Sequence, residues 1–196
     1  MTQNLPRPLS ALHTDLPSHG PQCPPSACCI GQHPSPNPEP YLMYDILKLL
    51  HLIAAIVWMG GMTFMLLALR PATLAVMEPQ PRARLMAQVW QRFFNVVLIA
   101  VVVVLATGGH LYAGAAKAAH ASGNGLPLGW NLMAAFGLLM VLVFGHIRFA
   151  GFKKFQRAVA ASEWPVAAAA AATIHKLVVL NFVLGWLAIG AVRLLR

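Results

Sequence analysis

The sequence has few charged residues. Asp, Glu, Lys and Arg together make up 10% of its 196 residues, whereas hydrophobic residues make up 58%. An average soluble domain contains about 25% charged residues, so this composition excludes an ordinary soluble protein. It is typical of a protein embedded in the lipid bilayer.

Acidic residues are scarce, and beyond residue 40 the only ones are Asp45, Glu78 and Glu163. The sequence contains no paired-carboxylate site, no nucleophile with a neighbouring base and no phosphate-binding loop, which argues against hydrolytic chemistry. The net charge of +9 is spread over short connections and forms no basic face interleaved with aromatic residues. We therefore expect no nucleic-acid binding.

Cysteine is nearly absent. The three cysteines, Cys23, Cys28 and Cys29, all lie within the first forty residues, so no disulfide framework holds the rest of the chain together. Their C-x4-C-C spacing matches no established zinc pattern, and their odd number argues against simple pairing.

Long apolar runs are missing from the N-terminal part. Residues 1–40 contain ten of the fifteen prolines together with scattered Ser, Gln and Asn, and such a composition cannot bury enough apolar surface to fold. We predict a disordered tail over residues 1–42, without the features of a signal peptide. An alternative is that translation starts at Met43, directly before the first apolar segment.

Residues 43–196 contain four apolar segments, each bounded by charge. The first is free of charge from Leu49 to Leu69 and reaches the length of about 20 residues that a transmembrane helix needs. The pattern predicts an all-α protein, an integral membrane up-down bundle of four transmembrane helices joined by short connections. The predicted helices cover about 44–69, 93–116, 129–148 and 172–194.

Positive charge is distributed unevenly between the two sides of the predicted bundle. Nine positive residues flank the first and third connections: Arg70, Arg82, Arg84, Arg92, Arg148, Lys153, Lys154, Arg157 and Lys176. The opposite side has four: Lys48, Lys117, Arg193 and Arg196. Because cytoplasmic loops carry the excess of Lys and Arg, we predict that both termini are periplasmic.

Each predicted helix carries one histidine, and these are His51, His110, His146 and His175. Because the helices alternate in direction, His51 pairs in depth with His110, and His146 with His175, at levels separated by roughly 20 Å. Ionisable residues inside a membrane usually serve a function, and imidazole binds copper, zinc or haem iron. The alternative is that these histidines only pack or hydrogen-bond between helices.

Methionines follow the first histidine along one helix face. Met62 and Met65 share this face with His51 and lie toward the cytoplasmic side, where His146 and His175 are expected. Thioethers are soft ligands that suit Cu(I), although methionine also fills gaps in packing. Asn95, Asn131 and Asn181 are predicted to hydrogen-bond across helices.

Several stretches together resemble a known family. They are "LKLLHLIAAIVWMGG" at Leu47 to Gly61, "LRPA" at Leu69 to Ala72, "RFF" at Arg92 to Phe94 and "NFVLGWLAIGAV" at Asn181 to Val192. Over about residues 43–196 the chain resembles the CopD-type copper-resistance membrane proteins of bacteria. The resemblance implies an inner-membrane protein in copper uptake or tolerance, working with a periplasmic copper carrier.

The chain also resembles the HemJ-type protoporphyrinogen oxidases, in which a first-helix histidine that matches His51 ligates haem. That family pairs it with a lysine on a later helix, but here Lys153 and Lys154 come after the end of the third segment. Two hypotheses stay open at this point. One is a copper-handling membrane protein, and the other is a b-type haem protein with a redox partner and histidine ligands at two levels.

Overall fold

The computed structural model describes residues 38–195, and this part of the chain is helical without any strand. The elements are α1 (Pro38–Phe64), η1 (Met65–Leu69), α2 (Arg70–Val76), α3 (Pro79–Ala121), α4 (Leu128–His146), η2 (Ile147–Gly151), α5 (Phe152–Ala160) and α6 (Trp164–Leu194). The two η elements are π-helical turns that continue the helices before them. The described residues therefore form four long rods, α1–η1–α2, α3, α4–η2–α5 and α6.

All four rods are long and apolar enough to cross a membrane. The candidate spans cover Tyr41–Val76, Pro79–Ala121, Leu128–Ala160 and Trp164–Leu194. Many large apolar side chains face outward, among them Ile99, Leu142 and Trp186. A soluble monomer rarely exposes so much contiguous apolar surface, whereas a bilayer covers it. The predicted all-α class and the four transmembrane helices are confirmed.

The helices are longer than the sequence pattern predicts. The first connection consists only of Met77 and Glu78, and the third only of residues 161–163. The predicted ends were placed where charge begins, but Arg and Ala favour helix, so the basic segments continue the rods. Helix α1 begins at Pro38, so residues 38–42 are helical and not part of a disordered tail. The rest of the predicted tail lies outside the described residues.

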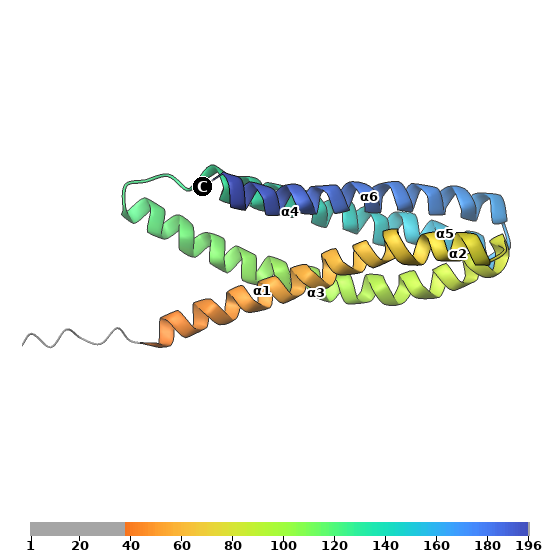
Figure 1. Cartoon of the computed structure of the whole chain (residues 1–196), viewed down its shortest axis with the longest axis horizontal. Helices are drawn as coiled ribbons and strands as arrows, with labels where there is room; N and C mark the ends of the chain where they lie inside the picture. The colour runs from red at the N-terminus through yellow and green to blue at the C-terminus, as the bar shows by residue number, and fades with distance from the viewer. Residues whose placement is uncertain (1–37, 196) are drawn as a thin grey trace, which may run out of the picture. The chain divides into compact units, whose positions relative to one another are not determined.

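The rods associate mainly as two antiparallel pairs. Helix α1 packs along α3, and α4 packs along α6, as Figure 1 shows. The two pairs also meet, because α3 contacts α4, α5 and α6, and α1 contacts α6. The end that carries the first and third connections holds the nine positive residues, and we call it the basic end. The other end, with the α3–α4 connection, is the opposite end.

An aromatic cluster joins the pairs toward the basic end. The rings of Phe94 and Phe152 are 5.2 Å apart, those of Trp90 and Phe155 are 4.9 Å apart, and Phe144 reaches Phe94 at 6.0 Å. These side chains come from α3, α4 and α5. Within lipid, helices associate by close packing and not by hydrophobic exclusion, so interlocking aromatic rings fix the arrangement of the rods.

Candidate functional site

His51 is the predicted ligand with the best-defined surroundings. Its ring is half-buried, and Nδ1 lies 3.1 Å from Oγ1 of Thr107 on α3. The Thr107 hydroxyl donates its hydrogen to the carbonyl of Val103 at 2.6 Å. That oxygen can then only accept from His51, so Nδ1 carries the hydrogen and Nε2 keeps its lone pair. Many metal-binding histidines are held in this way by a hydrogen bond at the other ring nitrogen.

Gly108 makes room for this ring. A Cβ atom at position 108 would lie 2.8 Å from Cε1 of His51 and 3.2 Å from Nδ1. Neither Thr107 nor Gly108 belongs to the site predicted from the sequence. The signal was present, because "TGG" at Thr107 to Gly109 interrupts an otherwise apolar run with a hydroxyl and two residues that lack a side chain.

His110 and His146 have exposed side chains. On α3, Thr107, Gly108 and Leu111 face the bundle, and His110 lies about 100° away from Leu111 around the helix axis. No three His, Cys, Asp or Glu side chains between residues 38 and 195 are grouped so that they could hold a metal ion. Joint ligation by His51 with His110, or by His146 with His175, stays a prediction.

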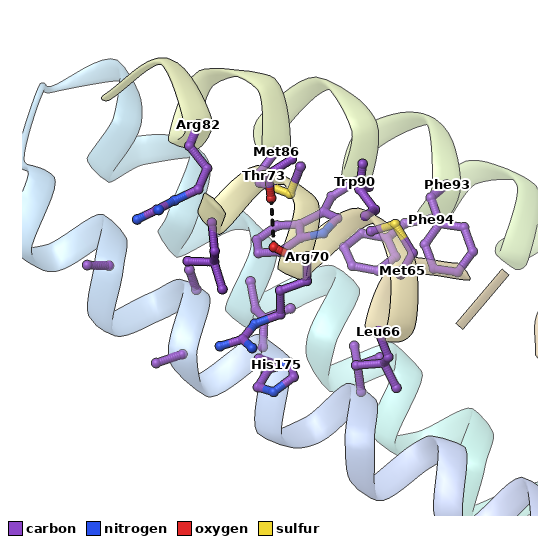
Figure 2. Close-up of a pocket in the computed structure, with 17 residues that line it drawn as sticks. Met65, Leu66, Arg70, Thr73, Arg82, Met86, Trp90, Phe93, Phe94 and His175 are labelled. Carbon is purple, nitrogen blue, oxygen red and sulfur yellow. Dashed lines mark hydrogen bonds between the residues drawn. The ribbon is translucent and has the colours of Figure 1, made fainter. Parts of the chain in front are cut away.

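A cavity of about 220 Å³ lies toward the basic end, between η1, α2, α3 and α6. Met65 and His175, predicted ligands from different helices, both line it, and Met86 adds a second thioether (Figure 2). Trp90 and Phe94 form part of its wall. The structure thus brings two of the predicted site residues to one cavity.

The charge in this cavity is positive. Arg70 and Arg82 line it, and Figure 2 shows the Arg70 side chain extending toward His175. No Asp or Glu is among the described residues that line the cavity. A permanently charged guanidinium disfavours a second cation nearby, and more strongly a doubly charged one. A singly charged cation is therefore favoured over a doubly charged one at a site formed by His175 and Met65.

Met62 lies deeper in the bundle, 2% exposed, and contacts α6. Nδ2 of Asn181 donates to Sδ of Met62 at 3.9 Å. The other two asparagines also bond across helices, since Asn131 accepts from Tyr112 and Asn95 accepts from Arg148. The predicted interhelical role of all three asparagines is confirmed.

Both π-helical turns lie in the half of the bundle nearer the basic end. η1 contributes Met65 to the cavity, and η2 follows directly after His146 and carries Arg148. The Arg148 guanidinium stacks over Phe152, while its Nε is buried without a partner among the described atoms. π-Helical turns inside α-helices occur frequently at functional sites, although hydrophobicity patterns do not reveal them.

One comparison with known proteins gives a match. The family described as CopD, copper resistance protein D, matches residues 87–195, which is more than half of the chain and includes α4, α5 and α6. No curated protein and no solved structure matches the sequence.

Proposed function

The chain belongs to the CopD family of copper resistance proteins, and from this premise we propose that it handles copper in the bacterial inner membrane through intramembrane histidine and methionine side chains. The family membership establishes a multi-pass copper-resistance membrane protein. We propose in addition which side chains bind copper, that the membrane is the bacterial inner membrane, and that the role is copper uptake or tolerance. One observation carries it: Met65 and His175, from the first and last rods, line the same cavity.

The proposed route has an entry level and an exit level. His51, with Nε2 free, is the proposed receiving ligand near the periplasmic side, where a periplasmic copper carrier would deliver the ion. His175 and Met65 are the proposed ligands near the cytoplasmic side. His110 and His146, exposed at these two levels, are the proposed second histidines of each level. This orientation follows the excess of positive charge at the basic end.

Copper content and copper tolerance of cells test the proposal. Cells that express the protein are compared with cells that express His51→Ala, His175→Ala or, as a matched control, His120→Ala. His120 is exposed on the last turn of α3. We expect the first two variants to lose the change in cell-associated copper that the wild type produces, and the control to retain it. An increase in copper would indicate uptake, and a decrease with higher tolerance would indicate removal.

Wild-type behaviour of both His51→Ala and His175→Ala, at equal protein levels in the membrane, would overturn the proposal. The histidines would then be packing residues, and the copper role of the family would have to rest on other side chains.

A further inference from the structure

Three methionines from two helices converge on α6 in the bundle interior. Met59 and Met62 lie on α1, and Met140 lies on α4. Met62 and Met140 are buried at 2% and 5% exposure, and Met59 is partly buried. This group lies between the level of His51 and the cavity, and it is distinct from both.

Gly185 of α6 is the point where two of these thioethers meet. A Cβ atom at position 185 would collide with Sδ of Met59 and would lie 3.2 Å from Cε of Met140. Any side chain here would displace the two methionines, so the glycine keeps them together at the α6 backbone. Since α1 and α4 do not pair directly along their length, α6 is the element that brings them together.

One turn nearer the basic end, Met62 faces Asn181. Nδ2 of Asn181 donates to Sδ of Met62 at 3.9 Å. Oδ1 of the same amide is buried, with no hydrogen-bond partner among the described residues, and Asn181 as a whole is 1% exposed. A buried amide oxygen without a partner is costly, and in native proteins most buried polar atoms have at least one hydrogen-bond partner in the protein or in ordered water.

We propose that Met59, Met62 and Met140 form a thioether site for monovalent copper, Cu(I), beside the Asn181 amide. The inference rests on the proposed function and deepens it, because it names the oxidation state and a site that neither histidine level includes.

The chemistry of these donors selects the ion. Thioethers are neutral and soft, and they favour Cu(I) over the harder Zn²⁺ or Cu²⁺. A single charge is also cheaper to transfer from water to a low-dielectric interior than a double charge. The Asn181 amide beside Met62 is neutral, so it adds no second charge next to the ion.

The three methionines of the proposed site lie next to the cavity along the bundle axis. Met59 and Met62 on α1 and Met65 on η1 follow one another at intervals of three residues, which places neighbours about 4.5 Å apart along the axis. Gly185, Asn181 and His175 follow the same direction on α6. The thioethers of Met59 and Met62 thus precede the cavity that Met65 and His175 line, so Cu(I) would pass from thioether to thioether toward the basic end.

The competing explanation is that these methionines only fill space between helices. Leucine would serve that purpose nearly as well, whereas it offers no lone pair to copper. The two explanations therefore differ in what a Met-to-Leu substitution does to Cu(I) binding, and they agree that the protein should still fold.

The test titrates the purified full chain, in detergent under reducing conditions, with Cu(I) held by a competing chelator. Met59→Leu, Met62→Leu and Met140→Leu are compared with the wild type. The control is Met133→Leu, a partly buried methionine on the same face of α4, two turns before Met140. We expect each of the three to bind Cu(I) about 10–100-fold more weakly, as for other losses around metal sites, and the control to bind normally. Copper X-ray absorption should show fewer sulfur neighbours in the three variants.

Two results would overturn the inference in distinguishable ways. If the wild type binds Cu(I) and the three variants bind it equally well, the thioether site is wrong while the proposed function stands. If the wild type binds no Cu(I), both fail. Size-exclusion profiles of all variants, compared with the wild type, confirm that a loss of binding is not a loss of folding.

Discussion

Nδ1 of His51 lies 3.1 Å from Oγ1 of Thr107, and that hydroxyl already donates its hydrogen to the carbonyl of Val103. The direction of the first hydrogen bond is thereby fixed, with the imidazole as donor. The relationship joins α1 to α3 and leaves Nε2 as the ring nitrogen with a free lone pair. A residue that no sequence pattern identified thus determines which atom of His51 can bind a metal.

Thr107→Val should weaken copper handling at the entry level. Valine has nearly the same shape but cannot accept the hydrogen of Nδ1, so the ring loses its fixed tautomer and orientation. Loss of such a supporting partner typically lowers metal affinity about 10–100-fold. Thr107→Ser keeps the hydroxyl and is the control. Copper uptake by cells that express each variant checks the prediction, and equal uptake by the Val and Ser variants would contradict it.

Gly108→Ala should disturb the same ring by steric overlap. The new Cβ atom would lie 2.8 Å from Cε1 of His51, so the ring or helix α3 must shift. Overpacking of this kind typically costs about 1–3 kcal/mol. Gly109→Ala is a matched control, because a Cβ atom at position 109 has no neighbour within 4 Å.

The prediction is checked by measuring the unfolding temperatures of both glycine variants in detergent. We expect a lower unfolding temperature for Gly108→Ala, and an unchanged or slightly higher one for Gly109→Ala, since alanine favours helix over glycine. A Gly108→Ala protein as stable as the control, with normal copper handling, would show that the ring moves aside without consequence.

The sequence was sufficient for the features that depend on composition and length. The four spans follow from apolar runs, and the bridges made by Asn95, Asn131 and Asn181 follow from the tendency of polar side chains in membrane helices to hydrogen-bond across helices. The depth of each histidine also follows from its position along a helix. The helix face on which each histidine lies does not follow from the sequence, because almost every face of these helices is apolar. The exposed position of the His110 side chain therefore could not be predicted.

Contacts between segments that are distant in the sequence could not be predicted either. Gly185 and Met140 looked like ordinary residues of apolar helices, and only the packing of α4 on α6 brings them to Met59. The π-helical turns change the phase of two rods without any distinctive residue. The helix ends were misplaced because charge ends a membrane span but does not end a helix.

Arg70→Gln should strengthen cation binding in the cavity. The Arg70 guanidinium shares the cavity with His175 and Met65 and repels any cation bound there. Because the Arg70 side chain is exposed and solvent screens its charge, we expect an increase in Cu(I) affinity of about two- to tenfold. The control is Arg92→Gln, which removes the same charge from an exposed residue that does not line the cavity. Chelator competition on the purified proteins provides the measurement, and equal affinities of both variants would contradict the prediction.

The connections at the basic end should be cytoplasmic. Single cysteines at Gln80 and Gly125 test this after Cys23, Cys28 and Cys29 are replaced by Ser. Gln80 is exposed at the start of α3, and Gly125 lies in the opposite connection with open space around it. A membrane-impermeant thiol reagent added to intact cells should label Gly125→Cys but not Gln80→Cys. The reverse pattern would invert the proposed direction of the copper route.

The absorption spectrum of the purified protein should separate copper from the haem b hypothesis. A b-type haem with two axial histidines needs two imidazoles on opposite sides of one iron, inside the bundle. His51 and His110 are the two histidines at one level, so they are the candidates for such a pair. Because the chain belongs to the CopD family of copper resistance proteins, we expect protein from haem-replete cells to show no Soret band, and copper to be retained after purification in a reducing buffer. A Soret band that His51→Ala and His110→Ala both remove would contradict this expectation, because it would place the two histidines on one haem iron.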